Sequence, residues 1–153
     1  PDGSGMMKAV WEAESPLPTA GFSLGNFKTD EVKTPGGVSV DAYANVGLPD
    51  RYMDLQKAGT LGNLSTLPAL KTELSQADLA ERIYTVYFGN LPYDHITVTQ
   101  QSGCDYGESW PMLVSVPICG FWSPVIQQQF GLLNYDASYW RETTPDEWAH
   151  QGW

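Results

Sequence analysis

The chain has 153 residues, about one domain's length, of which 42% are hydrophobic and only 17% charged. A sequence of this length and apolar content can bury a core, which excludes an intrinsically disordered protein. Eight basic against 18 acidic side chains give a formal charge of -10. Such a charge repels phosphate backbones and anionic lipid surfaces, so neither nucleic acid nor a membrane is an expected partner.

The N-terminus shows no signal peptide, and no apolar run approaches the ~18 residues of a membrane-spanning helix. We therefore expect a soluble chain as given, and the sequence leaves its compartment open. Residues 1–5, Pro-Asp-Gly-Ser-Gly, are interpreted as a linker or vector scar ahead of Met6 or Met7.

The first predicted structure is a β-hairpin. Residues 21–28 and 38–45 are partly alternating and rich in Phe, Val, Tyr and Ala, with Thr-Pro-Gly-Gly between them at residues 34–37. Residues 49–67 have mixed polarity and contain Gly59 and Gly62. A loop and a broken helix both remain possible for that stretch.

Residues 68–88 are predicted to form the longest helix, ending at Gly89 as its C-terminal cap. Its apolar side chains recur at steps of three and four residues, at Leu70, Leu74, Ala77, Ala80, Ile83, Tyr84 and Tyr87. Asp78 and Arg82 lie four residues apart on its polar side, where an ion pair is worth a few tenths of a kcal/mol.

Two strands are predicted to follow and to pair with each other. Residues 96–99 are β-branched, and residues 112–118 form an apolar run between prolines. The expected fold class is therefore α+β: a small mostly antiparallel sheet, one long helix packed on it and a short C-terminal helix.

Cys104 and Cys119 are the only cysteines, too few for a disulfide scaffold. Buried thiols are the favoured interpretation, and a bridge is the alternative. Ser109 lacks the second glycine of a G-x-S-x-G nucleophile elbow, so a serine hydrolase is not expected.

The C-terminal segment carries the candidate chemistry. Thr144 as N-cap, Pro145 at the first helical position and Glu147 in a capping box predict a helix that begins at Pro145. Asp146, Glu147 and His150 follow the spacing of H-E-x-x-H, in which two ligands four residues apart share one helical face and the Glu polarises a metal-bound water. The same residues also fit a well-capped helix start without a metal.

Residues 144–153, TPDEWAHQGW, resemble the zinc helix of aminopeptidase N-like metallopeptidases, a thermolysin-like (gluzincin) family. Residues 84–116 are similar to the helix and strands that precede this zinc helix in large bacterial members. The resemblance implies a junction with a preceding β-domain over residues 6–48 and a truncated catalytic subdomain over residues 49–153, all packed as one unit.

Carried over by position, the resemblance implies zinc as cofactor, His150 as a ligand and Glu147 as the general base. Asp146 occupies the place of the family's first histidine, and its side chain is shorter than imidazole. The family's third ligand, a Glu on a later helix, has no counterpart here, and the amine-binding G-x-M-E-N motif is not intact. His95, otherwise expected at the surface, is the spare ligand available.

The expected function is a metal-dependent hydrolase in which an activated water attacks a peptide, ester or phosphoester substrate with low efficiency. The alternative is a non-catalytic folding unit that self-associates through exposed apolar surface. Both interpretations predict a homo-oligomer, most simply a two-fold dimer. Trp148 and Trp153 belong to a group of aromatic side chains expected to build core or an interface left open by truncation. In the dimer they are expected on the exposed surface, with His150 or His95 of the second copy completing the metal site.

Overall fold

A computed structural model describes residues 20–59, 64–131 and 139–152, together with residues 5, 8, 10, 12, 16 and 17. The strands are β1 (Phe27–Lys33), β2 (Ser39–Asn45), β3 (His95–Gln101), β4 (Glu108–Trp110) and β5 (Leu113–Pro117). The α-helices are α1 (Asp50–Lys57), α2 (Leu70–Phe88), α3 (Pro124–Gln129) and α4 (Tyr139–Ala149), with short 3-10 helices η1 (Leu67–Ala69) and η2 (Ile118–Phe121). None of these helices is long and apolar enough to cross a membrane.

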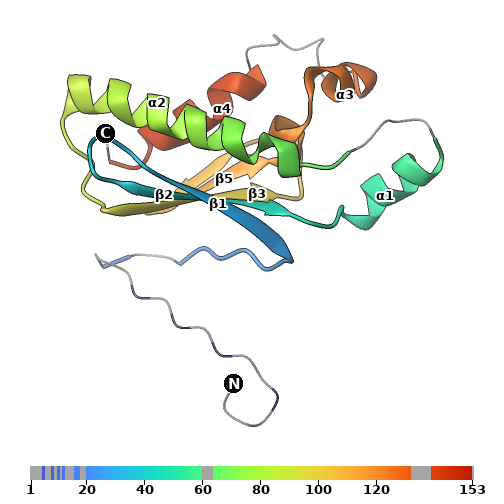
Figure 1. Ribbon diagram of the computed structural model, residues 1–153, viewed down its shortest axis with the longest axis horizontal. Helices are drawn as coiled ribbons and strands as arrows, with labels where there is room; N and C mark the ends of the chain where they lie inside the picture. The colour runs from blue at the N-terminus through green and yellow to red at the C-terminus, as the bar shows by residue number, and fades with distance from the viewer. Residues whose placement is uncertain are drawn as a thin grey trace.

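The five strands form one mixed sheet in the order β1-β2-β3-β5-β4. The outer pairs β1/β2 and β4/β5 are antiparallel, and the inner pairs β2/β3 and β3/β5 are parallel. Helices α2 and α4 lie over the same face of the sheet (Figure 1). The α+β class is confirmed, as is the pairing of the two strands predicted after the long helix.

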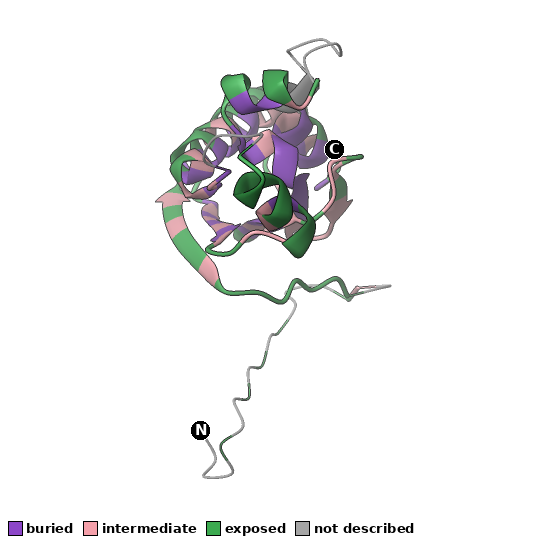
Figure 2. Ribbon diagram, turned by 90° about the vertical axis from the view of Figure 1, so that its right-hand side faces the viewer, coloured by how far each residue is buried: buried purple, intermediate pink, exposed green. Residues whose placement is uncertain are grey.

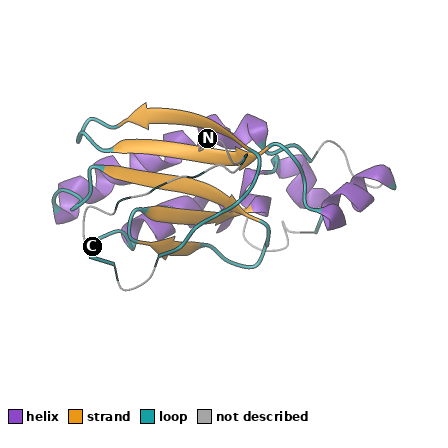
Figure 3. Ribbon diagram, turned by 90° about the horizontal axis from the view of Figure 1, so that it is seen from below, coloured by secondary structure: helices purple, strands orange, loops and turns teal. Residues whose placement is uncertain are grey.

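The hairpin is confirmed, but its first strand lies later than the predicted residues 21–28. The turn fixes the register: Thr34 N–H donates to the Val38 carbonyl at 2.9 Å, and pairing runs back from Lys33↔Ser39 to Phe27↔Asn45. The chain before β1 runs instead along the sheet face that carries no described helix (Figure 3). At Gly21 it is so close that a Cβ there would lie 3.2 Å from Cδ2 of Leu113.

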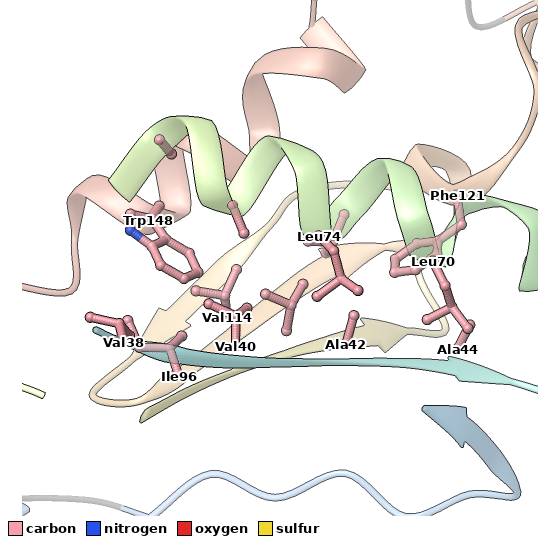
Figure 4. Packing of buried hydrophobic residues seen from close by; sticks show 14 residues of the cluster. Val38, Val40, Ala42, Ala44, Leu70, Leu74, Ile96, Val114, Phe121 and Trp148 are labelled. Atoms are coloured by element: carbon pink, nitrogen blue, oxygen red, sulfur yellow. The ribbon is translucent and has the colours of Figure 1, made fainter. Parts of the chain in front are cut away.

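Alternation along β2 directs Val40, Ala42 and Ala44 toward the helices, and all three are fully buried. Leu70 and Leu74 of α2 pack against them from above, as the period of the helix predicts (Figure 4). Figure 2 shows the buried residues gathered between sheet and helices. The single main core therefore sits on one face of the sheet.

The long helix is confirmed over Leu70–Phe88, preceded by the 3-10 turn η1. Gly89 caps it with a φ of 90°, and its N–H bonds the Thr85 carbonyl at 3.0 Å. Arg82 and Asp78 form the expected ion pair at 2.8 Å. Residues 49–67, for which a loop and a broken helix both remained possible, contain helix α1. Its Tyr52 is buried in a second cluster with Trp122 and other residues.

The favoured interpretation of Cys104 and Cys119 as free thiols is wrong, because the two form a disulfide with their Cα atoms 5.3 Å apart. Ile118 N–H donates to the Gly103 carbonyl at 3.0 Å, which brings the loop after β3 against the start of η2. That backbone contact, made by residues 15 apart, places the two side chains together.

Helix α4 begins at Tyr139, not at Pro145 as the capping signal predicts, so Pro145 lies inside the helix. The hydroxyl of Thr144 does not act as an N-cap. It donates a 2.6 Å hydrogen bond to Oε2 of Glu73 on α2. A tertiary contact has taken the hydroxyl that the local sequence pattern assigns to capping.

Candidate active site at the end of helix α4

Helix α4 places Glu147 against the edge of the sheet where β4 begins. Its side chain is only 8% exposed. Glycine at position 107 permits this approach, because a Cβ there would lie 2.7 Å from Cγ of Glu147 and 2.8 Å from its carboxyl carbon. The predicted general base thus has its carboxyl group wedged between a helix and an edge strand.

The surroundings of Glu147 favour its neutral form. Burial raises the pKa of this carboxyl, and the nearby charges of Asp146 and Glu108 raise it further, while His150 lowers it in part. A carboxyl group with a raised pKa holds a proton at higher pH than an ordinary carboxyl group does, which favours a role in proton transfer. The charge interactions also indicate that these four side chains lie near one another at the end of α4.

Asp146 and His150 are both exposed. The helix ends at Ala149, so His150 lies in the turn directly after it, and residues four apart on such a segment face the same side. Within the described ranges, no group of three or more His, Cys, Asp and Glu side chains is arranged to hold a metal. One copy of the chain therefore offers a pair of exposed donors with Glu147 beside them.

His95 lies elsewhere. It begins β3, and its Nε2 pairs with Oδ2 of Asp41 at 3.2 Å. Its neighbour in sequence, Ile96, points into the core together with Trp148, so His95 and Asp41 lie on the other face of the sheet. The structure does not bring this histidine to the end of α4.

A hydrogen-bond network that no sequence motif predicts fixes the end of α4 to the β4–β5 turn. Gln151, which is 2% exposed, accepts from the Met112 N–H at 2.8 Å and donates to the Trp110 carbonyl at 2.9 Å. It also donates to Oγ of Ser109, which in turn donates to the Glu147 carbonyl at 2.8 Å. Met112 has a φ of 64°, the left-handed region, which marks the tightness of this turn.

The expectation that Trp148 is exposed is wrong. Its side chain has 0% exposure and packs among Val38, Ile96 and Val114 (Figure 4). Its Nε1–H is buried without a hydrogen-bond partner, so the indole serves as core filling at some cost in desolvation. The other tryptophan named with it, Trp153, lies outside the described residues.

A groove of about 310 Å³ lies between β1 and α2, at the opposite edge of the sheet from β4. Its lining includes Asp30, Lys71 and Asp78, and it is separate from Glu147. No protein-family model and no curated protein sequence matches the chain, so a function has to be argued from the geometry around Glu147.

Proposed function

We propose that the chain is a metal-dependent hydrolase whose site lies at the end of α4, beside edge strand β4. The observation that carries the proposal is the position of Glu147. Its carboxyl is nearly buried against Gly107 and has a raised pKa, while Asp146 and His150 are exposed next to it. An acid–base group beside two potential ligands supports a role in metal-assisted hydrolysis.

Asp146 and His150 are the residues that would hold the metal, and zinc accepts both carboxylate oxygen and imidazole nitrogen. A bound divalent ion supplies Lewis-acid polarisation of an oxygen that it contacts. Glu147 takes up and releases the proton, and its contact with Gly107 keeps that carboxyl in one position. Gln151 and Ser109 hold the helix end that presents these side chains.

Two donors are fewer than the three protein ligands of an ordinary catalytic zinc site. We therefore propose an open metal site with slow turnover of small substrates, which contain activated peptide, ester or phosphoester bonds. Asp146 and His150 lie exposed at the surface, which gives such substrates access. The same exposure means that the site discriminates weakly between different kinds of bond.

The experiment is elemental analysis of protein purified without added zinc, repeated on His150→Ala and on His95→Ala. Stoichiometric metal in the parent and in His95→Ala, with loss in His150→Ala, is the expected result. His95 is the matched control because it is also exposed but lies on the other face of the sheet, paired with Asp41. Absence of metal from the parent protein contradicts the proposal. If the Glu147→Gln variant hydrolyses an activated ester as fast as the parent protein does, Glu147 is not the general base.

A second candidate is a self-associating unit without catalysis. The observation that favours it is a group of exposed apolar side chains on the C-terminal half of α2. The two candidates separate on metal content, because self-association through an apolar surface requires no metal.

A further inference from the structure

The C-terminal half of α2 exposes large apolar side chains that neither the sheet nor α4 covers. They are Leu79 at 57%, Ile83 at 45%, Val86 at 81%, Tyr87 at 76% and Phe88 at 63% exposure. We call these five residues the α2 patch. Ala77 and Ala80 of the same helix pack onto the sheet. Leu79, Ile83 and Val86 lie on the side of the helix away from these alanines, whereas Tyr87 and Phe88 lie at its C-terminal end, beyond the residues that pack on the sheet.

The α2 patch is poor in charge, although the chain as a whole carries -10. Residues 83–93 include no Asp, Glu, Lys or Arg. Glu81 is 2% exposed and is therefore buried away from a partner, and Arg82 is already paired with Asp78. Two copies of an acidic protein repel each other least where such a surface meets its counterpart.

The size of the α2 patch is close to what a stable dimer needs. Five side chains of this kind, exposed by half to four fifths, present roughly 600 Å², the upper end for a patch on a monomer. A standard interface buries about 800 Å² per partner. The half-buried ring of Tyr84, whose centroid lies 6.1 Å from that of Phe88, borders the patch and extends its area toward that value.

We infer that a second copy of this chain covers the α2 patch, with the two α2 helices antiparallel across a two-fold axis at Ile83. Leu79 lies four residues before Ile83 and Tyr87 four residues after it. A two-fold axis there sets Leu79 of each copy against Tyr87 of the other, so the stripe is complementary to itself. A partner of opposite charge would have nothing to recognise on this surface.

This interface does not rest on the proposed hydrolase function. It borders α4, because the Tyr84 hydroxyl donates to the Pro145 carbonyl at 3.1 Å and Gly152 lies against Pro92. The second copy therefore stands beside the segment that carries His150. Adding a chelator distinguishes an apolar interface, which persists, from one built on a shared metal, which dissociates.

The test is sedimentation of the full chain across micromolar concentrations, with and without EDTA. We expect a dimer in both conditions, and Val86→Glu weakens it at least about tenfold. Val125→Glu is the matched control, because Val125 is 64% exposed on α3, away from the patch, and that variant remains dimeric. Circular dichroism of both variants verifies that they fold.

A second variant tests the axis itself. Both native cysteines are held in one disulfide, so Ile83→Cys introduces a thiol that meets its own counterpart and forms a cross-linked dimer on oxidation. Val125→Cys does not. A parent that stays monomeric, equal dimerisation of the two glutamate variants, or dissociation by EDTA overturns the inference, and failure of Ile83→Cys to cross-link overturns the placement of the axis.

Discussion

The hydroxyl of Thr144 on α4 donates a 2.6 Å hydrogen bond to Oε2 of Glu73 on α2, and both residues are buried. Burial raises the pKa of Glu73 to about 7, and the bond from Thr144 lowers it in part. An acid that titrates near neutral pH therefore lies between the two helices that cover the sheet.

The first prediction concerns stability against pH. The pKa of Glu73 is higher in the folded protein than its ordinary value of 4.5, so the folded state binds more protons between these values. Its contribution is fully present below pH 4.5 and is lost as pH rises through about 7. Glu73→Gln removes this dependence, so the variant gains up to about 3 kcal/mol relative to the parent between pH 4.5 and pH 8.

Urea unfolding of both proteins at several pH values measures this difference. Glu31→Gln serves as the control, because Glu31 is exposed on β1 and does not contact Thr144. A constant free-energy gap between Glu73→Gln and the parent across the whole range would contradict a titrating Glu73.

The second prediction concerns the glycine beside Glu147. In Gly107→Ala the new methyl group overlaps the Glu147 side chain, so we expect a loss of about 1–3 kcal/mol in unfolding free energy and a fall in any hydrolase activity. Gly103→Ala is the matched control, since the nearest atom to a Cβ there is Oδ2 of Asp105 at 3.8 Å. Thermal denaturation compares them, and equal stability of the two variants would show that Glu147 is not held against Gly107.

The third prediction concerns the anchor of α4. Gln151→Ala leaves the Met112 N–H and the Trp110 carbonyl without their partner, which costs about 1–3 kcal/mol. The amide of Met112 should then exchange with deuterium faster than in the parent. Gln128→Ala, at an exposed position of α3, is expected to change neither quantity. If the Met112 amide exchanges at the same rate in Gln151→Ala as in the parent, Gln151 does not anchor the end of α4 to this turn.

The fourth prediction concerns the disulfide between Cys104 and Cys119. It closes a segment with a sequence separation of 15, so its reduction should cost about 3 kcal/mol and lower Tm by roughly 6 to 12 °C. Calorimetry with and without dithiothreitol measures the shift. The double variant Cys104→Ser, Cys119→Ser should show the lower Tm and no response to the reductant, and a parent insensitive to dithiothreitol would contradict the bridge.

The fifth prediction concerns position 146. Asp146→His restores the two histidines, four residues apart, of the motif that residues 144–153 resemble, and zinc affinity should rise by about tenfold or more. Competition with a chromophoric chelator measures it. Asp146→Ala, which removes the donor at the same exposed site, should bind less zinc than the parent. If all three proteins bind zinc equally, the end of α4 does not hold the metal.

Much of the fold was predictable because local signals agreed with the tertiary structure. Alternation in residues 38–45, the three- and four-residue steps of residues 68–88 and the β-branched run from Ile96 each specify an element through the face that it buries. The start of β1 was not predictable, since the hairpin turn sets its register and residues 21–26 have an apolar pattern that the sheet does not use.

The sequence was enough to propose residues for the candidate site but not to predict their arrangement. The spacing of Asp146, Glu147 and His150 indicates a common helix segment, but the burial of Glu147 depends on Gly107, which is 40 residues earlier in the chain. The anchoring role of Gln151 could not be predicted from its position after His150. Its partners include backbone groups of a distant turn, and backbone groups leave no signature in a sequence.

The sequence by itself determined the α+β class, the hairpin, the long helix and the segment that carries the candidate chemistry, because each depends on contacts whose period is local. Only the tertiary structure decided that α4 begins before Pro145, that Trp148 is core and that the exposed apolar surface lies on α2. The physical reason is competition between contacts. A hydroxyl, an indole or an apolar stripe can serve several roles, and the neighbour that reaches it, such as Glu73 for Thr144, selects one.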